Sequence, residues 1–133
     1  MAVGPVPGLS APHDAACGYL ARAESALAEA AGAVEHTSRY ASAHMAALRA
    51  AAAVLAVRGR PHSRRGQRNA WVLLGAVAPE LAEWAAYFAA GSAKRSAAEA
   101  GRSRAVTIRE ADDLLRDATQ FVGVVERCLE HAP

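Results

Sequence analysis

Apolar residues recur every three or four positions along most of this chain of 133 residues, and this spacing constrains the fold more than any other feature. The spacing places apolar side chains on one face of an α-helix, whereas a half-buried strand needs strict alternation. Alanine supplies much of the apolar content, and the strand-favouring residues Thr, Ile and Tyr are few. We therefore predict an all-α fold, an antiparallel bundle of four to five helices.

The length and the composition indicate a single domain. A chain of this length fits one domain of roughly 100 to 200 residues and can bury a core without disulfides or metal ions. Residues 1–10 are rich in Pro and Gly and predict a disordered N-terminal arm. Residues 11–133 then form one helical-bundle domain, whose core depends on the leucines, two tryptophans and two phenylalanines.

Helix boundaries follow from caps and helix breakers. Thr107 and Glu110 form a capping box that starts the last helix, Asn69 can cap the third, and Thr37 or Ser38 the second. Pro79 removes an amide donor, so it begins a new helix or kinks one that continues. The apolar stripes include Val34 at the end of the first helix and Ile108 at the start of the last one. The expected helices span about 10–34, 39–57, 70–77, 79–100 and 107–129.

The sequence shows no pattern of a targeting signal, and this and its cysteine usage favour a cytoplasmic protein. The N-terminal segment contains three prolines and Asp14 before an apolar region can form, so it does not resemble a signal peptide. No uncharged apolar run approaches the roughly 18 residues of a membrane span. Cys17 and Cys128 are expected to be free thiols of a reducing compartment, although a disulfide between the first and last helices stays open. The abundance of arginine and alanine indicates a GC-rich genome, as in actinobacteria.

Residue spacing predicts no metal and no cofactor. The five histidines are scattered, and no two share one face of a helix at the spacing of metal ligands. The chain contains no glycine-rich phosphate loop and no nucleophile elbow.

Arg39 and His44 are the one pair of residues whose chemistry suggests catalysis. Five positions along a helix correspond to about 140° of rotation, so the two side chains do not stack on one face. A long arginine in the first turn can nevertheless border the same cleft as the histidine, and such a pair suits cleavage of a phosphodiester. The alternative is that His44 is a hydrogen-bonded core residue, one turn from Tyr40, while Arg39 is solvated or pairs with Glu35.

Three segments carry a resemblance to a known family. They are RYASAHMAALRAAAAVL at 39–55, VAPELAEWA at 77–85 and READDLLR at 109–116. With them the chain from about Ala15 to Leu129 resembles a small family of actinobacterial HEPN-domain proteins. The resemblance implies antiparallel helices, a homodimer and, in many members, a metal-independent ribonuclease.

The signature of that family is an arginine, four to six residues, and then a histidine, which Arg39 and His44 match. By this resemblance His44 would help to activate a ribose 2′-hydroxyl, and Arg39 would hold the phosphate. Tyr40 stands where active members commonly have a small polar residue, and the motif opens the second helix instead of a late one. Other HEPN domains are non-catalytic binding or scaffold modules.

A second candidate site is a segment rich in arginine and glycine, which we expect to be an exposed loop. It has no acidic residue to balance its charge, and guanidinium groups on such a loop can contact nucleic-acid phosphates. The alternative is a solvated linker without a ligand. The predicted nucleic-acid-binding residues are Arg58, Arg60, Arg64, Arg65 and Arg68.

Two functions follow from these observations. The first is a HEPN-like domain that binds RNA or another nucleic acid and cleaves RNA through Arg39 and His44 in a homodimer. The second is a non-catalytic module that binds a protein partner or a second copy of itself. Neither function requires a cofactor or a membrane.

Overall fold

The computed structural model describes residues 7–59 and 69–130, and every regular element within these ranges is helical. The predicted all-α fold is therefore confirmed for this part of the chain. The elements are α1 (Pro7–Gly32), α2 (His36–Arg58), α3 (Ala70–Val77), the 3-10 helix η1 (Pro79–Leu81), α4 (Ala82–Ala90), α5 (Ser92–Glu99) and α6 (Ile108–Glu130).

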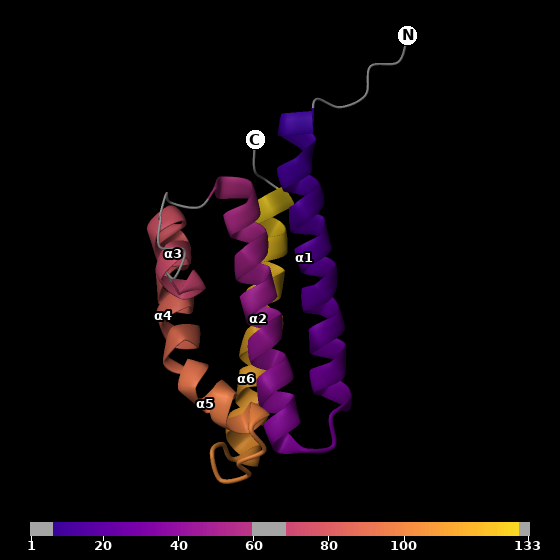
Figure 1. Cartoon of the computed structure of the whole chain (residues 1–133), viewed down its shortest axis with the longest axis vertical. Coiled ribbons are helices and arrows are strands. Elements are labelled where there is room, and N and C mark those ends of the chain that lie inside the picture. The colour runs from indigo at the N-terminus through magenta and orange to yellow at the C-terminus, as the bar shows by residue number, and fades with distance from the viewer. Residues whose placement is uncertain (1–6, 60–68, 131–133) are drawn as a thin grey trace.

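Three long helices and a column of short ones make up the bundle (Figure 1). The long helices α1, α2 and α6 lie side by side, and α2 packs against both of the others. The short helices α3, α4 and α5 follow one another along α2 and α6 on the side away from α1. Helix α2 therefore lies in the centre of the molecule, and residues on different faces of α2 meet different surroundings.

Alanine makes up much of the buried surface of α1 and α2. Ala23 and Ala30 of α1, and Ala43, Ala47 and Ala50 of α2, are fully buried. Such small side chains let two helix backbones approach closely, but each buries little apolar area. The alanine-rich sequence thus explains how the helices approach one another, and the larger share of the hydrophobic driving force must come from elsewhere.

An aromatic cluster supplies that driving force between α6 and the short helices. Phe121 of α6 is fully buried, and its ring centroid lies 5.1 Å from that of Phe88 and 5.4 Å from that of Trp84. Trp71 of α3 is 3% exposed and stacks on Phe88 at 5.3 Å. These side chains join α3, α4 and α6 into one core.

The predicted caps are partly confirmed. Asn69 accepts a hydrogen bond from the Trp71 amide at 2.8 Å. Thr107 and Glu110 exchange hydrogen bonds of 2.8 and 3.0 Å, and α6 follows directly. Thr37 and Ser38 do not cap α2, because the helix already begins at His36 and Thr37 is buried in its first turn.

Several boundaries differ from the prediction. Helix α1 begins at Pro7 and ends at Gly32, so Val34 lies in the turn beyond it and is 94% exposed. Ile108 is the first residue of α6 and is 63% exposed, because the core-facing stripe begins one turn later at Ala111. The helix expected at 79–100 is divided into a 3-10 turn, α4 and α5, so the described residues contain six α-helices.

Gly91, between α4 and α5, lies against the tip of the Tyr40 side chain. A Cβ atom at this position would lie 2.7 Å from the Tyr40 hydroxyl, so a larger residue would require the buried Tyr40 side chain to shift. Glycine also has a low helix propensity, which favours an interruption here.

Two observations bear on the environment of the protein. Helix α2 is long and apolar enough to cross a membrane. However, 56% of its most apolar stretch is buried inside the bundle, as in the core helix of a soluble protein. Cys17 is exposed, Cys128 is half-buried, and both are free thiols.

Candidate functional site

Arg39 is held by two contacts at the start of α2. Its Nη1 atom lies 2.7 Å from Asp112 Oδ1 on α6, and its Nη2 atom donates to the Ala33 carbonyl at 2.9 Å. The side chain is 19% exposed. Asp112, and not the neighbouring Glu35, is therefore the ion-pair partner of Arg39, which joins α2 to α6 and to the turn after α1.

His44 lies in the core. The residue is 0% exposed, and its Nε2 atom donates a hydrogen bond of 2.8 Å to the Phe88 carbonyl. The rings of Trp71 and Phe88 meet the imidazole edge-on, with centroids 5.9 and 6.1 Å away, while Tyr40 stacks beside it. Its Nδ1 atom is buried without a hydrogen-bond partner in the part of the chain described. The imidazole is thus enclosed by aromatic rings and a helix backbone.

Burial is the main cause of the shifted pKa of His44. It lowers the pKa of the imidazole from its ordinary value, and the Arg95 charge lowers it further, while the hydrogen bond to Phe88 and the Glu99 carboxylate oppose the shift. A neutral imidazole with its proton on Nε2 fits this environment, because a carbonyl oxygen can only accept. The remaining lone pair on Nδ1 faces protein atoms and not solvent.

The two motif residues therefore do not share a cleft within one chain. Arg39 faces the end of the bundle, and His44 faces the aromatic core, as their separation of about 140° around the helix requires. The intervening Tyr40 faces a third region, the junction of α4 and α5.

Arg39 lines a pocket of about 280 Å³ at the end of the bundle, together with Val34, Glu35, His36 and Ile108. We call it the bundle-end pocket. His36 is bonded through Nε2 to the Ser103 carbonyl at 2.9 Å. Two strongly exposed apolar side chains, Val34 and Ile108, flank the pocket. This site could not be predicted from the sequence, because Val34 and Ile108 continue apolar stripes and only the positions of the helix ends expose them.

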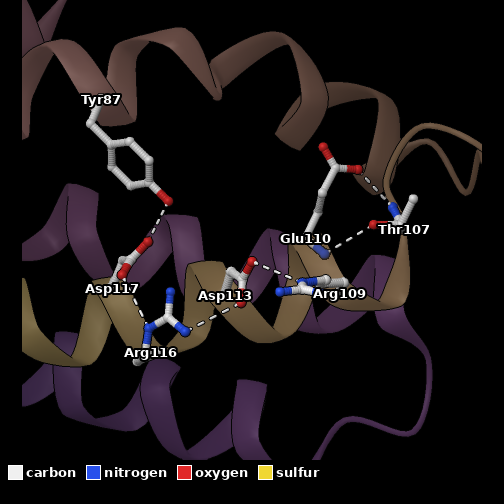
Figure 2. A network of polar contacts seen from close by, with 7 residues as sticks. All are labelled: Tyr87, Thr107, Arg109, Glu110, Asp113, Arg116 and Asp117. Carbon is white, nitrogen blue, oxygen red and sulfur yellow. Dashed lines mark hydrogen bonds and ion pairs between the residues drawn. The ribbon is translucent and has the colours of Figure 1, made fainter.

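Tyr40 lines a second pocket, of about 270 Å³, with Tyr87, Lys94, Glu110 and Asp113. We call it the polar pocket. Figure 2 shows its α6 side, where Asp113 follows the capping-box residue Glu110 along the helix and Tyr87 reaches across from α4. The Tyr87 hydroxyl donates to Asp117 at 2.6 Å, and Lys94 forms an ion pair with Glu110. The sequence signal for this pocket was a polar aromatic residue, Tyr40, on an otherwise apolar helix face.

Burial and neighbouring charges perturb several groups of the polar pocket. Burial raises the pKa of Tyr87, and its hydrogen bond to Asp117 raises it further. Burial also raises the pKa of Tyr40, against the opposing effect of the Lys94 charge. The hydrogen bond from Lys94 holds the pKa of the Glu110 carboxyl below its usual value. The side chains that line the pocket thus include two phenols, the carboxyl groups of Glu110 and Asp113, and the amino group of Lys94.

Of the predicted nucleic-acid-binding arginines, only Arg58 lies among the described residues. It forms an ion pair of 2.6 Å with Glu80 and approaches the Val77 carbonyl at 3.3 Å. Arg60, Arg64, Arg65 and Arg68 lie outside the described residues. The described residues contain no group of three or more His, Cys, Asp or Glu side chains that could hold a metal ion.

The arrangement of helices and the Arg39 to His44 spacing describe an all-α bundle with an arginine and a histidine on one central helix. Residues 30–126 match the family described as HEPN_SAV_6107-like HEPN, and the chain belongs to this family. The matched region runs from the end of α1 into the last turns of α6 and includes both pockets and the aromatic cluster. No curated protein and no solved structure matches the chain.

Proposed function

We propose that this HEPN domain is a non-catalytic interaction module that acts as a homodimer in the cytoplasm. One observation carries the first part of the proposal: His44 is 0% exposed and donates its Nε2 proton to the Phe88 carbonyl. A general base must come within hydrogen-bond distance of the proton that it removes, directly or through one water molecule. An imidazole enclosed in this way has no such access, and Arg39 is engaged by Asp112 and Ala33.

The bundle-end pocket supports self-association as the activity of the module. A two-fold symmetric interface must be complementary to itself, so its patch needs an apolar centre and charges of both signs. Val34 and Ile108 supply the apolar centre. The exposed Glu35 carboxylate and the Arg39 guanidinium, which both line the pocket, supply the two charges. We therefore take a second copy of this chain as the occupant of this surface.

Incubation of the protein with single-stranded RNA, in the presence of a metal chelator, is expected to give no cleavage above the buffer background. The expected physical reason is that the neutral, buried His44 cannot receive a proton from a ribose hydroxyl. The measurement is the length distribution of the RNA on a denaturing gel. The matched variant is His44→Ala, which should leave the pattern unchanged. Cleavage by the wild type that disappears in a folded His44→Ala protein would establish a ribonuclease instead.

That second candidate is a ribonuclease or RNA-binding domain. Membership in a HEPN family and the spacing of four residues between Arg39 and His44 favour it. In this alternative the short helices must move away from α2, because Phe88 and Trp71 cover the imidazole.

Replacement of Val34 by aspartate is expected to convert the dimer to a monomer. Burial of one valine side chain is worth about 1.5 kcal/mol, and two-fold symmetry doubles the loss, so the dissociation constant should rise by roughly a hundredfold. Sedimentation equilibrium measures this change. Val72→Asp on α3 is the matched control, because Val72 is also exposed but lies outside the pocket. A monomeric wild type, or an equal effect of both variants, would contradict the proposed interface.

A further inference from the structure

The polar pocket contains a buried side chain whose polar atom has no partner. Tyr40 is 5% exposed, and among the described residues its hydroxyl makes no hydrogen bond. This hydroxyl lies against Gly91, which also lines the pocket, and it is near enough to Lys94 and Glu110 for both charges to act on it. A phenol that is otherwise buried therefore presents a free donor and acceptor to the pocket.

The charges of the pocket favour a cation as its ligand. Glu110 and Asp113 contribute two carboxylates, against one ammonium from Lys94. Asp117 adds a third carboxylate immediately behind the Tyr87 hydroxyl (Figure 2). Arg109 and Arg116 pair with Asp113 and Asp117, but neither arginine lines the pocket. An oxyanion in this position would meet carboxylates on the α6 side, whereas a cation would meet carboxylate and phenol oxygens.

Lys94 indicates which kind of cation fits. It is the only lysine in the sequence, and its ammonium group forms an ion pair with Glu110 at the pocket. The pocket thus already accommodates a primary ammonium group from its own chain. The Lys94 side chain is 48% exposed and the Glu110 side chain 38%, so solvent screens this pair and a competing ammonium can replace it.

Asp113 offers the second anchoring point. Its contacts are with Arg116 at 3.3 Å and Arg109 at 3.9 Å, and these arginine side chains are 68% and 90% exposed. Both are long distances for charged pairs, which are typically 2.7 to 2.9 Å when well formed. The Asp113 carboxylate therefore keeps capacity for a closer cationic partner.

We propose that the polar pocket binds a small primary diamine. One ammonium group would contact Asp113 and the Tyr40 hydroxyl, and the other would compete with Lys94 for Glu110. This site is separate from the bundle-end pocket and does not depend on the oligomeric state or on nuclease activity.

The proposal is tested by titrating the full chain with putrescine and following amide chemical shifts by NMR. We expect the largest shifts at Tyr40, Gly91 and Asp113 and a dissociation constant in the millimolar range. Lys94→Ala removes the competing ammonium and should tighten binding about two- to fivefold, the range of an exposed ion pair. Asp113→Asn should weaken binding by a similar factor. Tyr40→Phe should weaken it too, because it removes the hydroxyl that contacts the ammonium group, and this hydroxyl has no other partner whose loss could disturb the fold.

Matched controls separate this site from general attraction of cations. Glu35→Gln removes a carboxylate of the bundle-end pocket and should leave the affinity unchanged. Acetate, of opposite charge, should not shift the pocket amides. Weaker binding of Nα-acetyllysine amide than of putrescine supports a free diamine. The reverse order would overturn that assignment in favour of a lysine side chain of a partner protein. Absence of shifts at the pocket, or an unaltered affinity in Lys94→Ala, would overturn the proposal altogether.

Discussion

Replacement of Phe121 by alanine is expected to lower the free energy of unfolding by about 3 to 5 kcal/mol. Phe121 is fully buried where α6 meets α3 and α4, and its ring packs against Trp71, Trp84 and Phe88. Truncation removes the contacts between the phenyl ring and these three side chains. The alanine side chains of the surrounding helices are too short to fill the cavity that remains. Urea unfolding followed by far-UV circular dichroism measures the loss.

A loss of this size is a large fraction of the stability of a domain, which is typically about 5 to 15 kcal/mol. Val72→Ala provides the control, because Val72 is 55% exposed on α3 and its truncation should cost less than about 1 kcal/mol. If Phe121→Ala costs no more than Val72→Ala, the aromatic cluster is not the main source of stability in this bundle.

Acidification is expected to destabilise the wild type through His44. The folded-state pKa of this histidine is lowered, so the unfolded chain takes up a proton at a higher pH than the folded protein does. The stability that the neutral imidazole contributes is therefore complete above the unfolded pKa, near 6.5, and is lost as the pH falls through the folded pKa. Each unit of difference between the two pKa values corresponds to about 1.4 kcal/mol.

His44→Gln tests this assignment, since the glutamine Nε2 atom can take the place of the histidine Nε2 donor to the Phe88 carbonyl but does not titrate in this range. The variant should be less stable than the wild type at pH 7.5 and should lose less stability between pH 7.5 and pH 5. Measurement of the unfolding free energy at both pH values decides the matter. His36→Gln is the matched control, because His36 lies at the surface of the bundle end and also bonds through Nε2. A wild-type pH dependence that persists in His44→Gln would place the titrating group elsewhere.

The two residues of the HEPN motif connect α2 to other helices in this chain. Its histidine ties α2 to the end of α4 through the Phe88 carbonyl, and its arginine ties α2 to α6 through Asp112. Tyr40, between them, opens on the polar pocket. The three residues belong to one short segment of helix, yet each meets a different part of the bundle.

Local patterns in the sequence were sufficient for much of the secondary structure. The Thr107 to Glu110 capping box and the Asn69 cap depend on neighbouring residues alone, and both appear as predicted. The start of α2 and the division of the helix at Gly91 were missed. Both places meet parts of the chain that local patterns do not reveal: Thr37 is buried by packing in the first turn of α2, and Gly91 lies against the Tyr40 hydroxyl.

The sequence by itself determined that this chain folds into amphipathic helices, because helical periodicity and caps act over a few neighbouring residues. It also showed that Arg39 and His44 have the spacing of a HEPN motif. Only the tertiary structure decided where the motif residues face, since that depends on which helix covers each side of α2. Placement of the short helices over one side of α2 buried His44, and the ends of α1 and α6 exposed Val34 and Ile108.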